Sequence, residues 1–125
     1  MHISHEVRQS EKLVITTASG RFDFGEYGIQ LALLFNNVEL AGFSLLLDVR
    51  QAEVDHLSNA DLTAYAGAPL TPVPPKCLAI LVTTDTQREL TQAYITARYT
   101  QKHYSPCRVF DQLDKALFWI KAEDK

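Results

Sequence analysis

The sequence predicts an α/β domain with a mostly parallel sheet of about five strands, an antiparallel N-terminal edge strand and four helices. Two observations support this fold class. Three runs rich in apolar and β-branched residues, which favour strands, read LVITTAS, FSLLLDVR and CLAILVTT. The segments between them carry apolar residues at helical spacing, and strands that alternate with helices form βαβ units with parallel strands.

The first two strands should pair through a short turn. Residues 2–9 alternate weakly between apolar and polar side chains, as an edge strand does. Residues 9–11 suit a turn. Residues 13–19 form the second strand, which Gly20 is expected to end.

The first helix is expected to start after Asp23, because Asp23 and Glu26 have the spacing of a capping box. Asn36, Asn37 and Gly42 supply its stop signal. Apolar residues recur at helical steps along this segment and predict a broad buried face; they are Ile29, Leu31, Leu33, Leu34, Phe35 and Val38.

The middle of the chain continues the alternation. Residues 43–50 predict a central strand, residues 59–66 a short helix and residues 77–84 another buried strand. The intervening GAPLTPVPPK contains four prolines, which favour stiff, extended backbone over helix or strand.

The longest helix is expected over residues 85–103, with Asp85 as its cap and with Arg98 among the side chains that face water. CRVF, residues 107–110, predicts a short strand, and a last helix opens at Asp111 or Gln112. No repeat or boundary divides residues 1–125, which we expect to form one domain.

Composition excludes several classes of protein. Of the 125 residues, 46% are hydrophobic and 22% charged, as in ordinary globular domains, and the net charge of −3 argues against a general nucleic-acid binder. No apolar run approaches the roughly 20 residues that span a bilayer. The polar N-terminus is not a signal peptide. The two cysteines, Cys77 and Cys107, suit buried reduced thiols, which predicts a cytoplasmic protein.

The pattern resembles the SpoIIAA-like family, which has a STAS/SEC14-type domain. The resemblance rests on Gly20 after the first long strand, on LLLDVR, on KCLAILVTTD and on RVFDQLDKALFWI, and it covers nearly the whole chain. It implies a sheet in which successive strand–helix units wind as a superhelix. It also implies a choice of roles, because STAS domains bind a partner kinase and are switched by serine phosphorylation, whereas SEC14-type domains carry a lipid. Many members have no known activity.

Ser58 is the candidate phosphoacceptor that this resemblance suggests. Asp48 matches the aspartate that ends the strand before the switch serine, but the Asp-Ser-Ser-Gly-like stretch is absent, since Asp55 is followed by His56 and Leu57. The sequence from Ser58 to Asp61 is S-x-x-D, which is typical of a helix cap. Both interpretations stay open.

Other candidate residues would form a ligand or partner surface. Asp48, Thr84 and Asp85 should lie near the carboxyl ends of parallel strands, where α/β sheets bind ligands, although the last two also suit helix caps. Arg50 is placed to bind an anion or to pair with a neighbouring carboxylate.

A second group of candidates lies on the helices. Phe24 and Tyr27 either line an apolar groove, with the proline-rich loop as a lid, or make core contacts. Tyr94 and Arg98 frame a pocket or partner surface, or are a core residue and a solvated one.

The sequence predicts no cofactor, no metal site and no catalytic motif. We therefore expect a non-enzymatic binding or regulatory module that acts through an unknown protein partner, with a homodimer as one arrangement. The alternative is a carrier or sensor of a small apolar, lipid-like ligand in a cleft near the first helix and the proline-rich loop.

Overall fold

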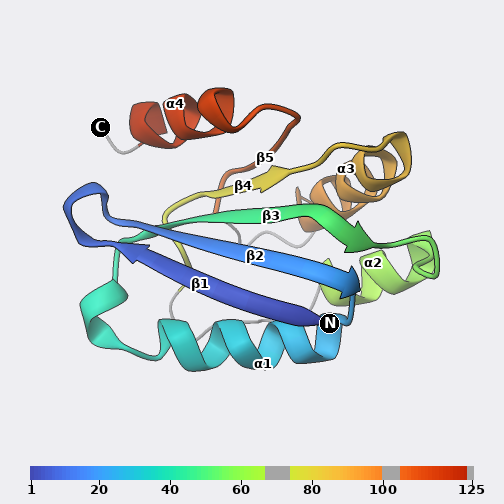
Figure 1. Cartoon of the computed structure of the whole chain (residues 1–125), viewed down its shortest axis with the longest axis horizontal. Helices are drawn as coiled ribbons and strands as arrows, with labels where there is room; N and C mark the ends of the chain where they lie inside the picture. Colours follow the sequence, from blue (N-terminus) through green and yellow to red (C-terminus); the bar gives the residue numbers. More distant parts are fainter. Residues whose placement is uncertain (67–73, 100–104, 124–125) are drawn as a thin grey trace.

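The elements follow the predicted order, with two short 3-10 helices added (Figure 1). The computed structural model describes residues 1–66, 74–99 and 105–123. Within these ranges the elements are β1 (His2–Arg8), η1 (Gln9–Glu11), β2 (Leu13–Arg21), α1 (Phe24–Phe35), η2 (Val38–Leu40), β3 (Ser44–Glu53), α2 (Asn59–Ala66), β4 (Leu78–Leu81), α3 (Asp85–Tyr99), β5 (Cys107–Phe110) and α4 (Leu113–Glu123).

The five strands form one sheet whose spatial order is the order of the sequence, β1-β2-β3-β4-β5. β1 is antiparallel to β2, and the strands from β2 to β5 are parallel to one another. The predicted fold class is therefore confirmed, including the antiparallel N-terminal edge strand and the four helices. The predicted turn after the first strand is η1, and Lys12 closes it with a φ of 51°.

The sheet separates two hydrophobic cores. α1, α2 and α3 cover one face, and α4 covers the other. Because side chains alternate along a strand, Leu45 and Leu47 of β3 pack in the core of the three helices, whereas Leu46 packs with Trp119 and Ile120 of α4. The central strand is thus buried on both faces, as its continuous apolar run predicted.

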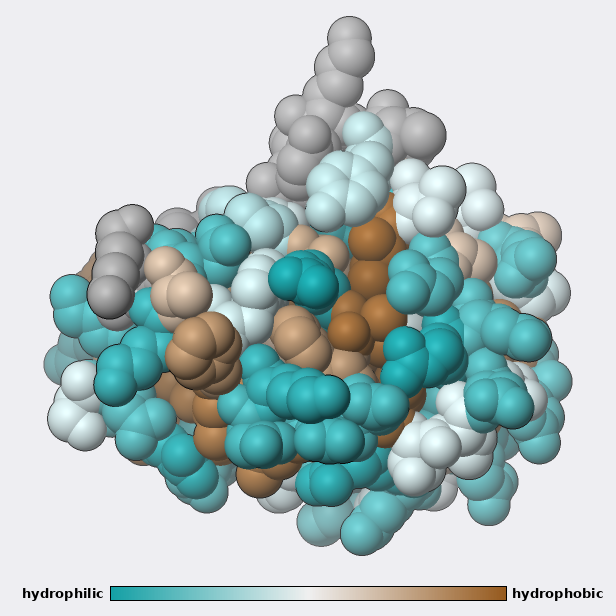
Figure 2. All heavy atoms as spheres, turned by 90° about the horizontal axis from the view of Figure 1, so that it is seen from above, coloured by the Kyte–Doolittle hydropathy of each residue, from teal (hydrophilic) through white to brown (hydrophobic). Residues whose placement is uncertain are grey.

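Seen from the side on which α4 lies, the surface is largely hydrophilic, and an apolar strip crosses its centre (Figure 2). α4 buries Ala116, Trp119 and Ile120 against the sheet. It leaves Phe118 exposed at 78%. One side of this helix therefore supplies the second core, while its other side stays in water.

The prediction that Gly20 ends the second strand is wrong. β2 continues to Arg21, and its parallel pairing with β3 shifts register between Thr17 and Ser19. Gly20 has a φ of +80°, a left-handed conformation that glycine adopts without steric cost. The register shift therefore lies within β2, and the strand continues past it instead of ending there.

The broad buried face predicted for the first helix is wrong in part. The buried residues of α1 are Tyr27, Leu31 and Phe35. Ile29 and Leu33, one turn apart, are exposed at 64% and 70%. We call these two residues the α1 stripe; nearby, Val38 of η2 is exposed at 86%. Helical spacing placed Ile29 and Leu33 on α1 but did not select which side of the helix meets the sheet, and it wrongly extended the helix to Val38, which lies on η2.

The cap predicted for the long helix is also wrong. The hydroxyl of Thr84 accepts the backbone N–H of Gln87 at 3.0 Å, so Thr84 caps α3 and Asp85 is its first helical residue. A carboxylate at that position still faces the positive end of the helix dipole. At α1 the predicted cap is confirmed, because the Asp23 carboxylate accepts the N–H of Glu26 at 3.1 Å.

Candidate functional site

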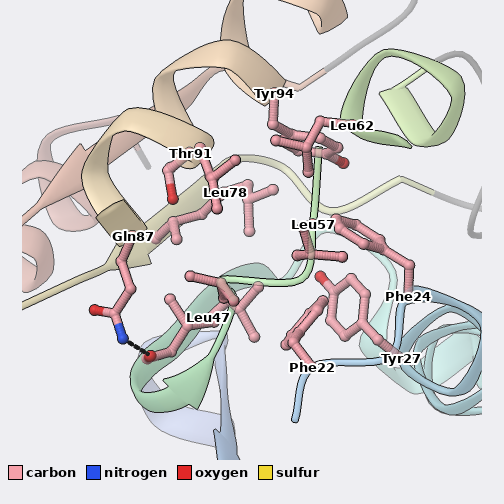
Figure 3. Close-up of a pocket in the computed structure, with 14 residues that line it drawn as sticks. Phe22, Phe24, Tyr27, Leu47, Leu57, Leu62, Leu78, Gln87, Thr91 and Tyr94 are labelled. Carbon is pink, nitrogen blue, oxygen red and sulfur yellow. Dashed lines mark hydrogen bonds between the residues drawn. The ribbon is translucent and has the colours of Figure 1, made fainter. Parts of the chain in front are cut away.

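A pocket lies between the sheet and the three helices of its first face (Figure 3). Its cavity volume is about 50 Å³, and the hollow around it, which includes open solvent, measures about 510 Å³. The lining side chains are mostly apolar; they are Phe22, Phe24, Tyr27, Leu47, Val49, Val54, Leu57, Leu62, Leu78, Ile80, Gln87, Leu90, Thr91 and Tyr94.

Aromatic side chains at the start of α1 form one wall of the pocket. The chain leaves β2 near Phe22, and the cap at Asp23 starts α1 at once, which brings Phe24 and Tyr27 beside Phe22. Phe24 contacts the edge of Phe22 at 5.0 Å between ring centroids and stacks on Tyr65 of α2 at 4.2 Å. The two alternatives for these aromatic residues are not exclusive here, because Phe22 and Tyr27 are buried and also line the pocket.

The loop between β3 and α2 crosses the pocket. Val54 and Leu57 of this loop are lining residues. The ring Nε2 of His56 lies 2.7 Å from the carbonyl oxygen of Phe22, and this hydrogen bond ties the loop to the end of β2. Leu57 is thereby held beside the aromatic wall (Figure 3). Most of the proline-rich segment that the sequence suggested as a lid, residues 67–73, lies outside the described residues.

Gln87 holds the end of β3 beside the pocket. Its Nε2 donates hydrogen bonds to the carbonyl oxygens of Val49 and Ala52 at 2.9 and 3.0 Å. Its Oε1 accepts the backbone N–H groups of Thr83 and Thr84 at 2.8 and 3.2 Å. The amide is therefore fully engaged within the protein, and it shapes the pocket wall without offering a free group to a ligand.

The sequence interpretation missed Gln87, although one signal was present. Gln87, Thr91 and Tyr94 recur at helical steps on α3, and Tyr94 was expected in the core. A polar residue on the same helical side as a core residue is buried with it. The carbonyl oxygens that accept from its Nε2 belong to β3, more than 30 residues earlier in the chain, and nothing local points to them.

Two phenols are the main polar groups of the pocket wall. Burial raises the pKa of Tyr27, and the neighbouring Tyr94 adds to the shift. Burial also raises the pKa of Tyr94 and outweighs the opposing influence of Arg98. Both side chains are therefore protonated at neutral pH, and each hydroxyl carries a proton to donate.

Arg98 does not face water as the sequence predicted. It is half-buried, and its Nη1 donates to the hydroxyl of Tyr94 at 3.2 Å. Its Nη2 donates to the carbonyl oxygen of Ser105 at 3.3 Å. The guanidinium thus lies one hydrogen bond behind the pocket wall.

The strand-end residues do not gather into one site. The Asp48 carboxylate accepts two bonds from the Arg50 guanidinium, at 3.0 and 2.9 Å, and the pairing raises the pKa of Arg50. Because Leu47 and Val49 line the pocket, alternation along β3 places Asp48 on the opposite face of the sheet. Thr84 is engaged as the cap of α3, and Asp85 starts that helix.

Ser58 caps α2 through reciprocal hydrogen bonds. Its hydroxyl accepts the N–H of Asp61 at 3.1 Å, and the Asp61 carboxylate accepts the N–H of Ser58 at 3.0 Å. These bonds lower the pKa of Asp61. A phosphate on Ser58 would meet the neighbouring Asp61 carboxylate, and like charges at this distance repel. Phosphorylation of Ser58 stays a prediction, and the hydroxyl has a complete structural role without it.

Replacing Ser58 by alanine is expected to lower the free energy of unfolding by about 1 kcal/mol, because the backbone N–H of Asp61 loses the hydroxyl that caps it. Urea unfolding followed by the fluorescence of Trp119, the single tryptophan, measures this change. Ser10→Ala in exposed η1 is the control and should change stability by less than about 0.5 kcal/mol. Equal stability of the two variants would show that the capping bonds contribute nothing.

The remaining chemistry of the described residues is limited. No three His, Cys, Asp or Glu side chains among them are placed to hold a metal ion, and none of the described helices is long and apolar enough to cross a membrane. Cys77 and Cys107 are buried and form no disulfide, and burial raises the pKa of Cys107 to about 12. No protein-family model and no curated protein matches the chain.

Proposed function

We propose that this protein is a non-enzymatic binding module that carries or senses a small apolar ligand in the pocket beneath α1, α2 and α3. The pocket is the observation that supports this most strongly. Twelve of its 14 lining residues are aliphatic or aromatic, the exceptions being Gln87 and Thr91. A pre-formed apolar hollow with a few polar groups is the usual form of a small-molecule site.

The resemblance to the SpoIIAA-like family supports the same proposal, because SEC14-type members hold a lipid in an apolar cleft. Phe24 and Tyr27, for which the sequence left open an apolar groove or core contacts, are both lining residues of this pocket. We also propose a cytosolic location, where thiols remain reduced, because Cys77 and Cys107 are buried and not bridged.

A regulatory role through protein–protein contact is the second candidate. The α1 stripe favours it, because Ile29 and Leu33 lie one turn apart and expose most of their apolar surface. A partner protein, or a second copy of this chain, would bury that surface. This role does not require the pocket to be occupied.

Mass spectrometry of the protein freshly purified from its native host separates the two candidates. A native spectrum with an excess of a few hundred daltons, lost on denaturation, is the expected result for a bound apolar compound. A bare dimer in which Leu33→Glu restores the monomer supports contact through the α1 stripe instead. A bare monomer argues against resident ligand and homodimer alike. An adduct of one phosphate that survives denaturation would identify a modified residue, and peptide mapping would show whether it is Ser58.

A pocket-filling substitution tests where a compound is bound. Leu57→Trp places a large side chain beside the aromatic wall, and we expect it to abolish the native mass excess. Leu33→Trp, with the same change on the exposed α1 stripe, should retain the excess. Retention by both variants would place the compound elsewhere and overturn the assignment of the pocket.

A further inference from the structure

The position of Arg98 indicates which charged group a ligand carries, on the premise of the proposed function that the pocket binds a ligand. Arg98 has five N–H groups and a permanent positive charge. Two of these groups reach Tyr94 and Ser105, while Nε is buried and has no hydrogen-bond partner among the described residues. No carboxylate of the described residues forms an ion pair with this guanidinium. A half-buried cation in this state is costly unless an anion joins it.

The rest of the chain offers little to neutralise Arg98. The segments outside the described residues near it in sequence, GAPLTPV (67–73) and TQKHY (100–104), contain no Asp or Glu. Asp124 is the one acidic side chain left, and it follows α4, whose described residues pack on the opposite face of the sheet. Among the described residues, therefore, no carboxylate supplies a counter-charge to Arg98.

Two tyrosine hydroxyl groups add hydrogen-bond donors to the wall of the pocket. The Tyr94 hydroxyl accepts its hydrogen bond from Arg98, so its own proton remains to be donated. Tyr27 has no hydrogen bond from its hydroxyl to any described residue, and Figure 3 shows this hydroxyl pointing toward the interior of the pocket, near Leu57. Two phenol donors thus lie at an otherwise apolar site, and the guanidinium of Arg98 lies behind one of them.

We propose that the ligand is a single-chain amphiphile with a carboxylate head, whose chain fills the apolar pocket and whose head accepts hydrogen bonds from the Tyr94 and Tyr27 hydroxyls, with the positive charge of Arg98 one hydrogen bond behind Tyr94. A phenol that accepts a hydrogen bond from a guanidinium is polarised into a stronger donor, and a hydrogen bond to an ionised carboxylate is roughly twice as strong as a neutral one. One positive charge offsets one carboxylate, whereas a phosphate monoester at neutral pH carries nearly two negative charges.

Isothermal titration with three probes of one chain length tests this head group. The probes are decanoate, 1-decanol and decyl phosphate, each below its aggregation concentration. We expect decanoate to bind at least about tenfold more tightly than 1-decanol, as one charged hydrogen-bonding contact provides. Equal affinity for these two probes overturns the carboxylate head but leaves an apolar pocket. Preference for decyl phosphate also overturns it. Binding of none of the three overturns the apolar carrier itself.

Variants show whether Arg98 and Tyr94 make the difference. Arg98→Met should remove the preference for decanoate while the affinity for 1-decanol stays within about twofold, and Arg98→Lys should keep part of it. Tyr94→Phe keeps the ring in place and serves if Arg98→Met does not fold; it should weaken decanoate binding several-fold and 1-decanol binding by a smaller factor, because the bond lost to the carboxylate is charge-assisted. Equal losses for both probes would mean that these residues only shape the pocket, and the assignment of the head group would be wrong.

Discussion

Replacing Leu46 by alanine is expected to lower the free energy of unfolding by about 2–5 kcal/mol. Leu46 is fully buried on the central strand β3, where Ile15 of β2 and Ala79 of β4 are its neighbours across the ladder. Its side chain packs in the core beneath α4 with Trp119. Truncation removes apolar contacts and leaves a cavity, because strands paired on both sides cannot move inward to fill it.

Chemical denaturation with the fluorescence of Trp119 as the signal measures this loss, since the indole belongs to the same core. Leu33→Ala is the matched control: the side chain deleted is identical, but it is exposed at 70% on the α1 stripe. Its effect should stay within about 0.5 kcal/mol. A loss of similar size for Leu33→Ala would mean that this residue is buried in solution, by a partner copy or by repacking of α1.

The second large effect is expected for Gln87→Leu, which should cost about 2–4 kcal/mol. The side chain is 4% exposed, and leucine has a similar volume, so packing is largely retained. The substitution removes every hydrogen bond of the amide. The carbonyl oxygens of Val49 and Ala52 then stay in a protein interior without their donor, and such unsatisfied groups carry the full cost of desolvation.

Gln92→Leu on the same helix is the control, because Gln92 is exposed and should tolerate the change within about 0.5 kcal/mol. Gln87→Glu adds a second test: its carboxylate accepts from Thr83 and Thr84 but faces the Val49 carbonyl without a proton, so at neutral pH we expect it to be at least as destabilising as leucine. Unchanged stability of Gln87→Leu in thermal unfolding would contradict the role assigned to this amide.

The sequence predicted those features of the fold that local patterns determine. Apolar runs identified β3 and β4 as interior strands, and the capping signals at Asp23 and Ser58 located the starts of α1 and α2. Alternation of strands and helices then predicted a mostly parallel sheet, since a parallel connection needs a crossover. Each of these inferences depends on residues close together in the chain.

The features that the sequence did not predict depend on distant partners. Ile29 and Leu33 have the same spacing as the buried residues of α1, and only docking against the sheet decides which side is covered. Arg98 was assigned to water because arginine usually is, but its environment comes from Tyr94 and from Ser105 near the start of β5. The sequence leaves open whether Tyr27 lines a groove or packs in the core, because the enclosure around it requires β3, β4 and α3 together.

The match between sheet order and chain order has a consequence for synthesis on the ribosome. Each new strand emerges beside the strand made just before it, so the core under α1, α2 and α3 can assemble progressively from its N-terminal side. The opposite face has no such sequence of helices. Leu46 and Ala79 on that face stay uncovered until α4 emerges. Until then the nascent chain exposes an apolar sheet surface. Chaperones should therefore bind most to chains in which synthesis stalls before Leu113, the first residue of α4.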